Sequence, residues 1–248
     1  TEFPHLPPIN AVKVEKDQVL TLGNTKVKFW GVTHTIPDSM GIMIDTPHGW
    51  IINPGDYKLD QIDGVVTESE EKEYAQFDHA NVLLLMTDST NIENEGFALP
   101  EIKVHQGLEA ILRREKNNRI FIAAFASHIT RIIKIVEIAE QLGKKIVVEG
   151  RSMKVNIEIA IAAGMLKVQK DTIIQAQDIE HYPPDRIIIL STGAQGEEFA
   201  ALMRMATKNH KYIREINHHF FTGNHTFDNI KLCQILNHSL CFGQKTRN

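Results

Sequence analysis

Short apolar runs alternate with polar residues in the first quarter of the chain, and this pattern predicts β-strands. The runs cover residues 12–14, 19–22, 27–30, 41–45 and 50–52. The last two flank Thr46-Pro47-His48-Gly49, a turn-forming sequence that favours a hairpin. We therefore expect a mostly β region at the start of the chain.

A second pattern follows an acidic, polar stretch, and we expect a domain boundary near residues 60–78. Apolar runs at 82–86, 120–124, 145–148 and 186–190 alternate with helical patterns at 101–116, 129–142, 155–165 and 197–206. Strands that alternate with helices indicate a parallel sheet, because crossover helices bury their apolar stripes against its faces. The fold class expected from the residues is α/β.

Polar residues come directly after each of these four strands, at 87–91, 127–131, 150–153 and 191–196. The carboxyl ends of parallel strands meet at one edge of a sheet, so we expect the four loops to line a single crevice.

Composition removes several classes of protein. The 248 residues are 42% hydrophobic and 23% charged, with 27 Lys and Arg against 31 Asp and Glu, for a net charge of -4. We expect a soluble globular chain without a membrane span, in which nucleic-acid contact needs a local basic patch. Two cysteines and the lack of a signal-peptide pattern at Thr1 favour a reducing, cytoplasmic location.

One imidazole and one carboxylate, each in a turn that follows an early strand, are candidate metal ligands. His34 lies in a polar turn at 32–39, and a neutral imidazole there can ligate a metal, although a structural or surface histidine is the commoner reading. Asp56, in the turn 53–58, can bridge hard or borderline cations or simply cap the next turn.

Later polar residues suggest ligand contacts. Asp88 can bind a ligand or cap its own loop. Ser127, Thr130, His128 and Arg131 open a helix, where amide groups and the dipole favour a phosphate, whereas ordinary serine capping is the alternative. The loop at 193–196 lacks both the dinucleotide-binding glycine spacing and the lysine of a P-loop. Histidines 218, 219 and 225 form a metal cluster or a solvated segment.

Seven strings, taken in order, resemble ribonuclease J, a metallo-β-lactamase-fold ribonuclease of the β-CASP type. They cover residues 32–39, 46–49, 55–60, 88–91, 125–131, 150–153 and 192–197. The resemblance extends from about residue 6 to about residue 213. It implies the second half of a metallo-β-lactamase β-sandwich region in residues 1–63, a β-CASP domain with a helix-flanked parallel sheet in residues 78–213, and a divergent tail at 214–248.

The resemblance also implies residue roles. His34 matches a metal-binding histidine of the family, and Asp56 matches the carboxylate that bridges two zinc ions. Mn²⁺ or Mg²⁺ are alternative ions. The remaining matches are RNA-binding positions: Asp88, Ser127, His128, Arg131, Arg151, Ser152, Thr192, Gly193 and Gln195. RNA is the implied partner, and the family allows a homo-oligomer.

Departures from the family pattern limit the expected activity. The metal motif His-x-His-x-Asp-His does not occur in these residues, nor do the later Ser-Gly-His and Pro-Trp-His-Gly-like segments. Two ligands cannot hold two zinc ions that each need about four. We expect RNA phosphodiester hydrolysis of the ribonuclease J type, exonucleolytic from the 5' end, endonucleolytic or both, from a chain that is poorly active alone. Two alternatives stay open: a non-catalytic RNA- or nucleotide-binding module, and a metallo-hydrolase acting on a small ester or lactam.

Overall fold

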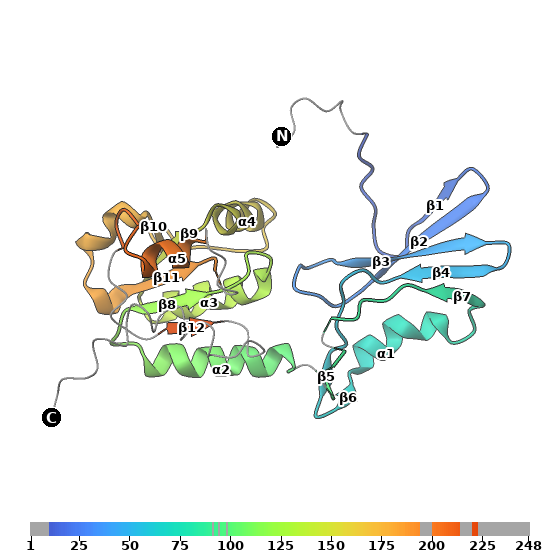
Figure 1. Ribbon diagram of the computed structural model, residues 1–248, viewed down its shortest axis with the longest axis horizontal. Coiled ribbons are helices and arrows are strands. Elements are labelled where there is room, and N and C mark those ends of the chain that lie inside the picture. The colour runs from blue at the N-terminus through green and yellow to red at the C-terminus, as the bar shows by residue number, and fades with distance from the viewer. Residues whose placement is uncertain are drawn as a thin grey trace. The chain divides into compact units, whose positions relative to one another are not determined.

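The computed structural model describes residues 10–90, 92–93, 95–97, 99–193, 200–213 and 220–222. The chain divides into two compact units, Thr1–Pro100 and Glu101–Asn248, which we call the N-terminal and C-terminal units. Each unit contains a five-stranded sheet, labelled in Figure 1. No helix in the described ranges is both long and apolar enough to cross a lipid bilayer.

The sheet of the N-terminal unit has the order β1-β2-β3-β4-β7. Its first four strands form an antiparallel meander: β1 (Val19–Leu22), β2 (Thr25–Gly31), β3 (Met40–Thr46) and β4 (Gly49–Asn53). These confirm four of the predicted strands and the hairpin at 46–49. Residues 12–14 were also predicted as a strand and are irregular instead; Val12 is 64% exposed and therefore has no packed surface to hold it extended.

One face of this sheet carries a small core. Trp30, Val32, Met43 and Ile52 are buried together, and the ring of Phe77 meets the Trp30 ring edge-on at 5.1 Å. Phe77 belongs to η1 (Ala75–Phe77), which continues from α1 (Glu68–Tyr74). The two-stranded ribbon of β5 (Gln61–Ile62) and β6 (Val65–Val66) precedes α1. The sequence predicted this acidic stretch only as a boundary.

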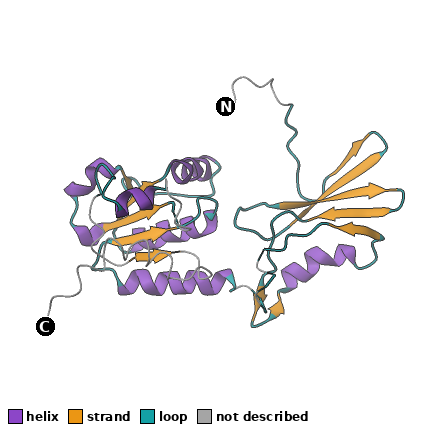
Figure 2. Ribbon diagram, in the orientation of Figure 1, coloured by secondary structure: helices purple, strands orange, loops and turns teal. Residues whose placement is uncertain are grey.

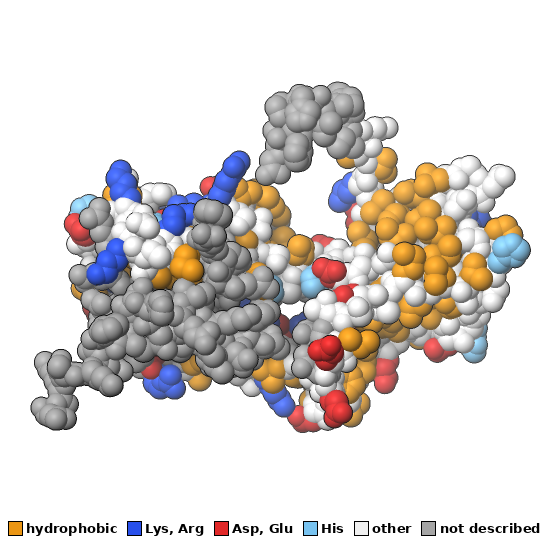
Figure 3. Space-filling view, in the orientation of Figure 1, with side chains coloured by type: hydrophobic (Ala, Val, Ile, Leu, Met, Phe, Trp, Pro, Cys, Tyr) orange, Lys and Arg blue, Asp and Glu red, His pale blue; other side chains and the backbone are white. Residues whose placement is uncertain are grey.

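The opposite face of the sheet is also apolar. Strand pairing places Phe29 beside Ile42, and Ile51 beside both Ile44 and Leu84, on the side away from Trp30. Ile42 is 40% exposed and Leu84 is 48% exposed, and no core cluster among the described residues includes this face. Figure 3 shows hydrophobic side chains gathered over this sheet.

The C-terminal unit contains the parallel sheet that the sequence predicted. Its order is β10-β9-β11-β8-β12, with every neighbouring pair parallel. The strands are β8 (Ile120–Ala123), β9 (Lys145–Glu149), β10 (Ile173–Ile174), β11 (Ile187–Ser191) and β12 (Phe220–Thr222). The helices are α2 (Glu101–Arg114), α3 (Ile129–Gln141), α4 (Arg151–Ala162) and α5 (Ala201–Ala206), with short 3-10 turns η2 (Ala176–His181) and η3 (Pro184–Arg186). Figure 2 shows helices flanking the strands.

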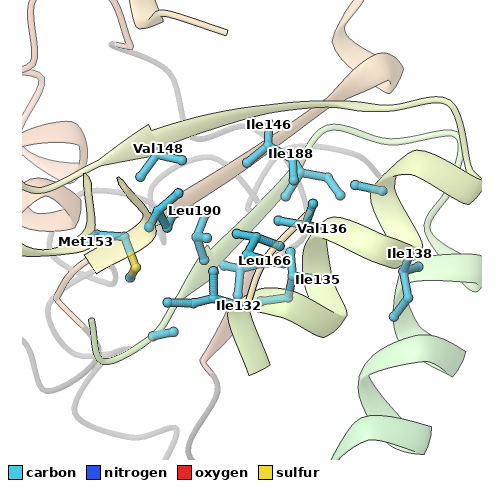
Figure 4. Close-up of a cluster of buried hydrophobic side chains, with 14 of the residues drawn as sticks. Ile132, Ile135, Val136, Ile138, Ile146, Val148, Met153, Leu166, Ile188 and Leu190 are labelled. Atoms are coloured by element: carbon cyan, nitrogen blue, oxygen red, sulfur yellow. The ribbon is translucent and has the colours of Figure 1, made fainter. Parts of the chain in front are cut away.

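Both faces of this sheet are buried. In β11, Ile188 and Leu190 point into a cluster with α2, α3 and α4, which Figure 4 shows in close-up. Their neighbours Ile187 and Ile189 point the other way, into a cluster with η2 and α5. Uninterrupted apolar strands are typical of a sheet buried on both sides, which is why the sequence could predict this one.

One predicted strand belongs to a different sheet. Residues 82–86 were predicted as the first strand of the parallel sheet, but β7 (Val82–Leu85) pairs in parallel with β4 of the N-terminal unit. An apolar run indicates that a strand is buried in a sheet, but it does not identify the strands with which it pairs. Here Leu85 pairs with Ile52 of β4. The compact units divide between Pro100 and Glu101, whereas the family domain limits at residues 63 and 78 stay predictions.

Candidate functional site

Three polar loops meet at one edge of the N-terminal sheet. Strands β2 and β4 are each antiparallel to β3, and β7 is parallel to β4, so β2, β4 and β7 all run in the same direction. Their carboxyl ends therefore lie at the same edge. The loops that follow them carry His34, Asp56 and Asp88. Asp88 thus belongs with the two predicted metal ligands and not, as predicted, with the loops of the parallel sheet.

Specific contacts join these loops. The Nε2 atom of His34 lies 4.0 Å from Oδ2 of Asp56, with side chains 29% and 81% exposed. The hydroxyl of Tyr57 lies 3.0 Å from the hydroxyl of Thr87 and so links the loop after β4 to the loop after β7. An imidazole nitrogen and a carboxylate oxygen are thereby presented to solvent side by side.

The Asp88 carboxylate is held in its charged form. Its Oδ1 accepts hydrogen bonds from the Thr90 backbone N–H at 2.9 Å and from the Thr90 hydroxyl at 2.8 Å. The pKa of Asp88 is lowered from its ordinary value, first by the Thr90 backbone N–H and then by the Thr90 hydroxyl, with a smaller electrostatic effect of His34. The side chain therefore has one of its two expected roles, because it caps its own loop; ligand binding by Asp88 stays a prediction.

The donors at this edge fit a metal in kind but not in number. A histidine nitrogen and a carboxylate oxygen are ligands that zinc accepts, and zinc normally takes about four ligands. Among the described residues, no group of three or more His, Cys, Asp or Glu side chains is arranged to hold an ion. Within the described residues, His34 and Asp56 are thus two of the about four ligands that zinc takes.

A second polar edge lies at the carboxyl ends of the parallel strands in the C-terminal unit. The Thr192 backbone N–H donates to the Glu149 carbonyl at 3.1 Å, which joins the ends of β11 and β9. The Asn156 side chain of α4 donates to the carbonyl of Ala126, after β8, at 2.8 Å. The three predicted loops of this sheet are therefore brought together.

Glycines allow two of these loops to approach closely. Gly150 has a φ of +112°, and a Cβ there would lie 2.4 Å from the Thr192 hydroxyl oxygen. Gly193 has a φ of +115°, and its Cβ would lie 2.8 Å from Cβ of Leu202. Both backbone conformations favour glycine, so these residues shape the edge and need not touch a ligand.

Exposed polar side chains follow Gly150. Arg151 and Ser152 form the first turn of α4 and are both exposed. The N-cap residue of α4 is Gly150, which has no side chain to accept the first amide groups of the helix. Thr192 is half-buried beside them. Gln195 lies outside the described residues.

The loop before α3 is less available. His128 is buried, with its ring edge-on to Phe125 at 5.2 Å, and Ser127 is half-buried. The Arg131 guanidinium donates to both carboxylate oxygens of Glu101 on α2, with distances of 2.6 and 3.1 Å. A phosphate would have to compete with this ion pair for Arg131.

One polar cluster at this edge was not predicted from the sequence. Glu149, the last residue of β9, is buried and lies 3.3 Å from Nε2 of His210 and 3.2 Å from Nζ of Lys154. Nδ1 of His210 accepts the backbone N–H groups of Tyr212 and Ile213, so Nε2 carries the ring proton and faces the Glu149 carboxylate. The only sequence signal is the acidic residue that ends the apolar run 145–148.

The C-terminal unit matches the model of a known protein family. Residues 117–219 match the family model described as "Ribonuclease J, beta-CASP domain". The chain carries the β-CASP domain of ribonuclease J. Three of the strand-end loops, at 127–131, 150–153 and 192–193, fall within the matched ribonuclease J residues.

Relatives extend the ribonuclease J match into the N-terminal unit. The chain is 39% identical over 188 residues to Ribonuclease J of Mycoplasma genitalium, which covers 76% of this chain and 33% of the relative. It is 35% identical over 201 residues to Ribonuclease J2 of Bacillus subtilis, and this match covers 81% of this chain and 36% of the relative. It is 37% identical over 204 residues to Ribonuclease J of Thermus thermophilus, covering 81% and 35%. The chain thus spans about a third of the length of these ribonuclease J relatives.

A solved structure supports the fold alone. A protein of unknown function from Enterococcus faecalis V583 superposes with a TM-score of 0.54 at 16% sequence identity, covering 75% of this chain and 47% of that one. The ribonuclease J match is carried by sequence, and the roles of individual residues stay predictions.

Proposed function

We propose that this chain is part of a cytoplasmic, metal-dependent ribonuclease that hydrolyses RNA phosphodiesters. The observation that carries the proposal is the approach of His34 Nε2 to Asp56 Oδ2, 4.0 Å apart, in a chain with a ribonuclease J β-CASP domain. His34 and Asp56 would hold zinc, or Mn²⁺ or Mg²⁺ in its place. When bound, the metal would supply Lewis-acid activation of the attacked phosphodiester.

The protein's own residues take the other roles. Asp56, the more exposed of the two proposed ligands, precedes Tyr57, whose hydroxyl contact with Thr87 would hold the Asp56 loop against the loop after β7. Arg151 and Ser152, in the first turn of α4 after its N-cap Gly150, would bind phosphate through guanidinium, hydroxyl and amide groups. Ser127, Thr192 and Gly193 shape the same edge, and Arg131 would reach a phosphate only after leaving Glu101.

Zinc binding tests the metal half of the proposal. We expect calorimetric titration of the purified chain with Zn²⁺ to show a weak site, because the described residues bring together His34 and Asp56 but no third donor. His34→Ala and Asp56→Ala should each abolish that heat, whereas His48→Ala, in the hairpin at the other end of β4, should leave it unchanged. A site that survives both ligand substitutions would contradict the assignment.

RNA binding tests the other half. Fluorescence anisotropy with a single-stranded RNA carrying a 5' phosphate should show affinity that falls with salt, because phosphate contacts release counterions. Arg151→Ala should weaken binding and reduce the salt slope by about one. Lys116→Ala is a matched control, because Lys116 is also exposed but lies before β8, at the opposite end of the parallel strands. Equal losses in both variants would argue against a specific RNA edge.

A second function remains a candidate because the described residues contain no group of three metal donors. The chain would then bind RNA through the C-terminal unit without cutting it. Cleavage of the same RNA with Mn²⁺ or Zn²⁺ separates the two functions. Slow turnover that Asp56→Ala abolishes supports the enzyme, and binding without any Asp56-dependent turnover supports the binding module.

A further inference from the structure

Glu70 is a buried acidic side chain that the proposed chemistry does not use. It lies on α1, whose other acidic residues are largely in contact with solvent, yet only 5% of its surface is exposed. Burying a carboxylate is costly unless it makes compensating hydrogen bonds. The buried Glu70 carboxylate therefore needs a hydrogen-bond donor to offset the cost of its burial.

That donor adjoins a candidate metal ligand. The Thr33 hydroxyl donates a hydrogen bond to Oε1 of Glu70. Thr33 stands between Val32, which is part of the Trp30 core, and His34. The Glu70 contact therefore fixes the backbone from which the His34 imidazole projects.

Thr33 also connects to the loop of the second ligand. Its carbonyl accepts the Lys58 backbone N–H at 2.8 Å, two residues beyond Asp56. Further along this loop, the Asp60 carbonyl accepts the Thr67 backbone N–H at 3.0 Å. Thr67 in turn caps α1 by accepting the Glu70 backbone N–H at 3.4 Å.

These bonds form a closed circuit. It runs from Thr33 through Glu70 and the start of α1 to Thr67, then through Asp60 and Lys58 back to Thr33. Both candidate ligands lie on segments that this circuit joins. Tyr74, one helical turn beyond Glu70, has a pKa raised to about 12, first by burial and then by the Glu70 charge.

We propose that Glu70 is a positioning residue that holds His34 in register with the Asp56 loop; this inference rests on the proposed metal role of His34 and Asp56. Glu70 touches neither ligand and acts through Thr33. Outer partners of this kind typically change metal affinity by about 10- to 100-fold when they are removed.

The test compares four variants of the whole chain. Glu70→Ala removes the acceptor, Thr33→Val removes the donor, and Glu70→Gln keeps a carbonyl acceptor of the same size. Glu73→Ala is the matched control: Glu73 lies one turn along α1 and pairs with Lys16, whereas the Thr33 hydroxyl donates to Glu70. Circular dichroism and thermal melting identify the variants that fold. If Glu70→Ala does not fold, Thr33→Val still tests the same hydrogen bond.

Two NMR readouts follow. The first is the apparent Zn²⁺ affinity from the His34 ring resonance, which we expect to weaken about tenfold in Glu70→Ala and Thr33→Val and to stay within about twofold of wild type in Glu70→Gln and Glu73→Ala. The second, without metal, is hydrogen exchange of the Lys58 amide. It should be faster in the first two variants and unchanged in the other two.

The outcomes separate this inference from the proposed function. Folded Glu70→Ala and Thr33→Val variants with wild-type zinc affinity and wild-type Lys58 exchange overturn the positioning role. If the His34 ring resonance of the wild-type chain does not shift when zinc is added, the proposed metal site is itself overturned. In that case Lys58 exchange still decides the linkage: faster exchange in Glu70→Ala supports it, and unchanged exchange refutes it.

Discussion

The guanidinium of Arg131 on α3 is bound in two places by the carboxylate of Glu101 on α2, with Nε–Oε1 and Nη2–Oε2 distances of 2.6 and 3.1 Å. The two side chains are only 14% and 21% exposed. This bidentate, largely buried ion pair joins α3 to α2. It gives Arg131 a structural role beside the RNA contact that the family resemblance implies.

Removing this pair should cost stability more than RNA affinity. Arg131→Ala leaves Glu101 without this charge partner, and we expect the C-terminal unit to lose about 2–4 kcal/mol of unfolding free energy in urea denaturation. Arg151→Ala, at an exposed position, should change it by less than about 0.5 kcal/mol. Arg131→Ala that weakens RNA binding as strongly as Arg151→Ala, at unchanged stability, would show that Arg131 contacts RNA directly.

The lowered pKa of Asp88 predicts an effect at acid pH. Because its folded-state pKa lies below the ordinary value of 3.8, its ionised form favours the folded state above that value, and this contribution disappears as the pH falls through the folded-state pKa. Thr90→Val removes the hydroxyl donor but keeps the backbone N–H. We expect the Asp88 pKa, measured by NMR titration of its carboxyl carbon, to rise toward 3.8 without reaching it. A pKa unchanged by the substitution would mean that the hydroxyl contact is absent in solution.

Gly150 should tolerate no side chain. Its φ of +112° disfavours other residues, and a Cβ would lie 2.4 Å from the Thr192 hydroxyl oxygen. We expect Gly150→Ala to lower the unfolding free energy of the C-terminal unit by about 3 kcal/mol. Gly164→Ala is the control, since Gly164 also has a positive φ but has no atom within 4 Å of the position that a Cβ would take; it should cost about 1 kcal/mol. Equal losses would mean that backbone conformation alone requires glycine at residue 150.

Much of this fold is readable because its signals are local. The run 186–190 is apolar throughout most of its length and becomes β11, buried on both faces. The stripe of isoleucines at 129–138 becomes the buried face of α3. Loops at the ends of such parallel strands share an edge by geometry, so the sequence could predict that the loops after β8, β9 and β11 lie together.

Other features depend on contacts between distant parts of the chain. The sequence ESEEKEY of α1 has no apolar stripe and is helical with Thr67 as its cap. Strand β7 has four apolar residues in a row and no alternation to indicate its sheet. The partners of Arg131 and Glu70 lie 30 and 37 positions away in the chain, and no local pattern identifies such pairs.

Adjacent residues of β3 offer a last test, because they point to opposite faces of the N-terminal sheet. Met43 is 4% exposed and packs with Trp30, whereas Ile42 is 40% exposed on the apolar face that no described core covers. Both tryptophans of the chain, Trp30 and Trp50, lie in this unit, so their fluorescence during urea denaturation reports on it alone. Met43→Ala should lower the unfolding free energy by about 2–4 kcal/mol by leaving a cavity, and Ile42→Lys should change it by less than about 1 kcal/mol while reducing the binding of a hydrophobic dye. Comparable losses from both substitutions would show that something covers the Ile42 face in solution.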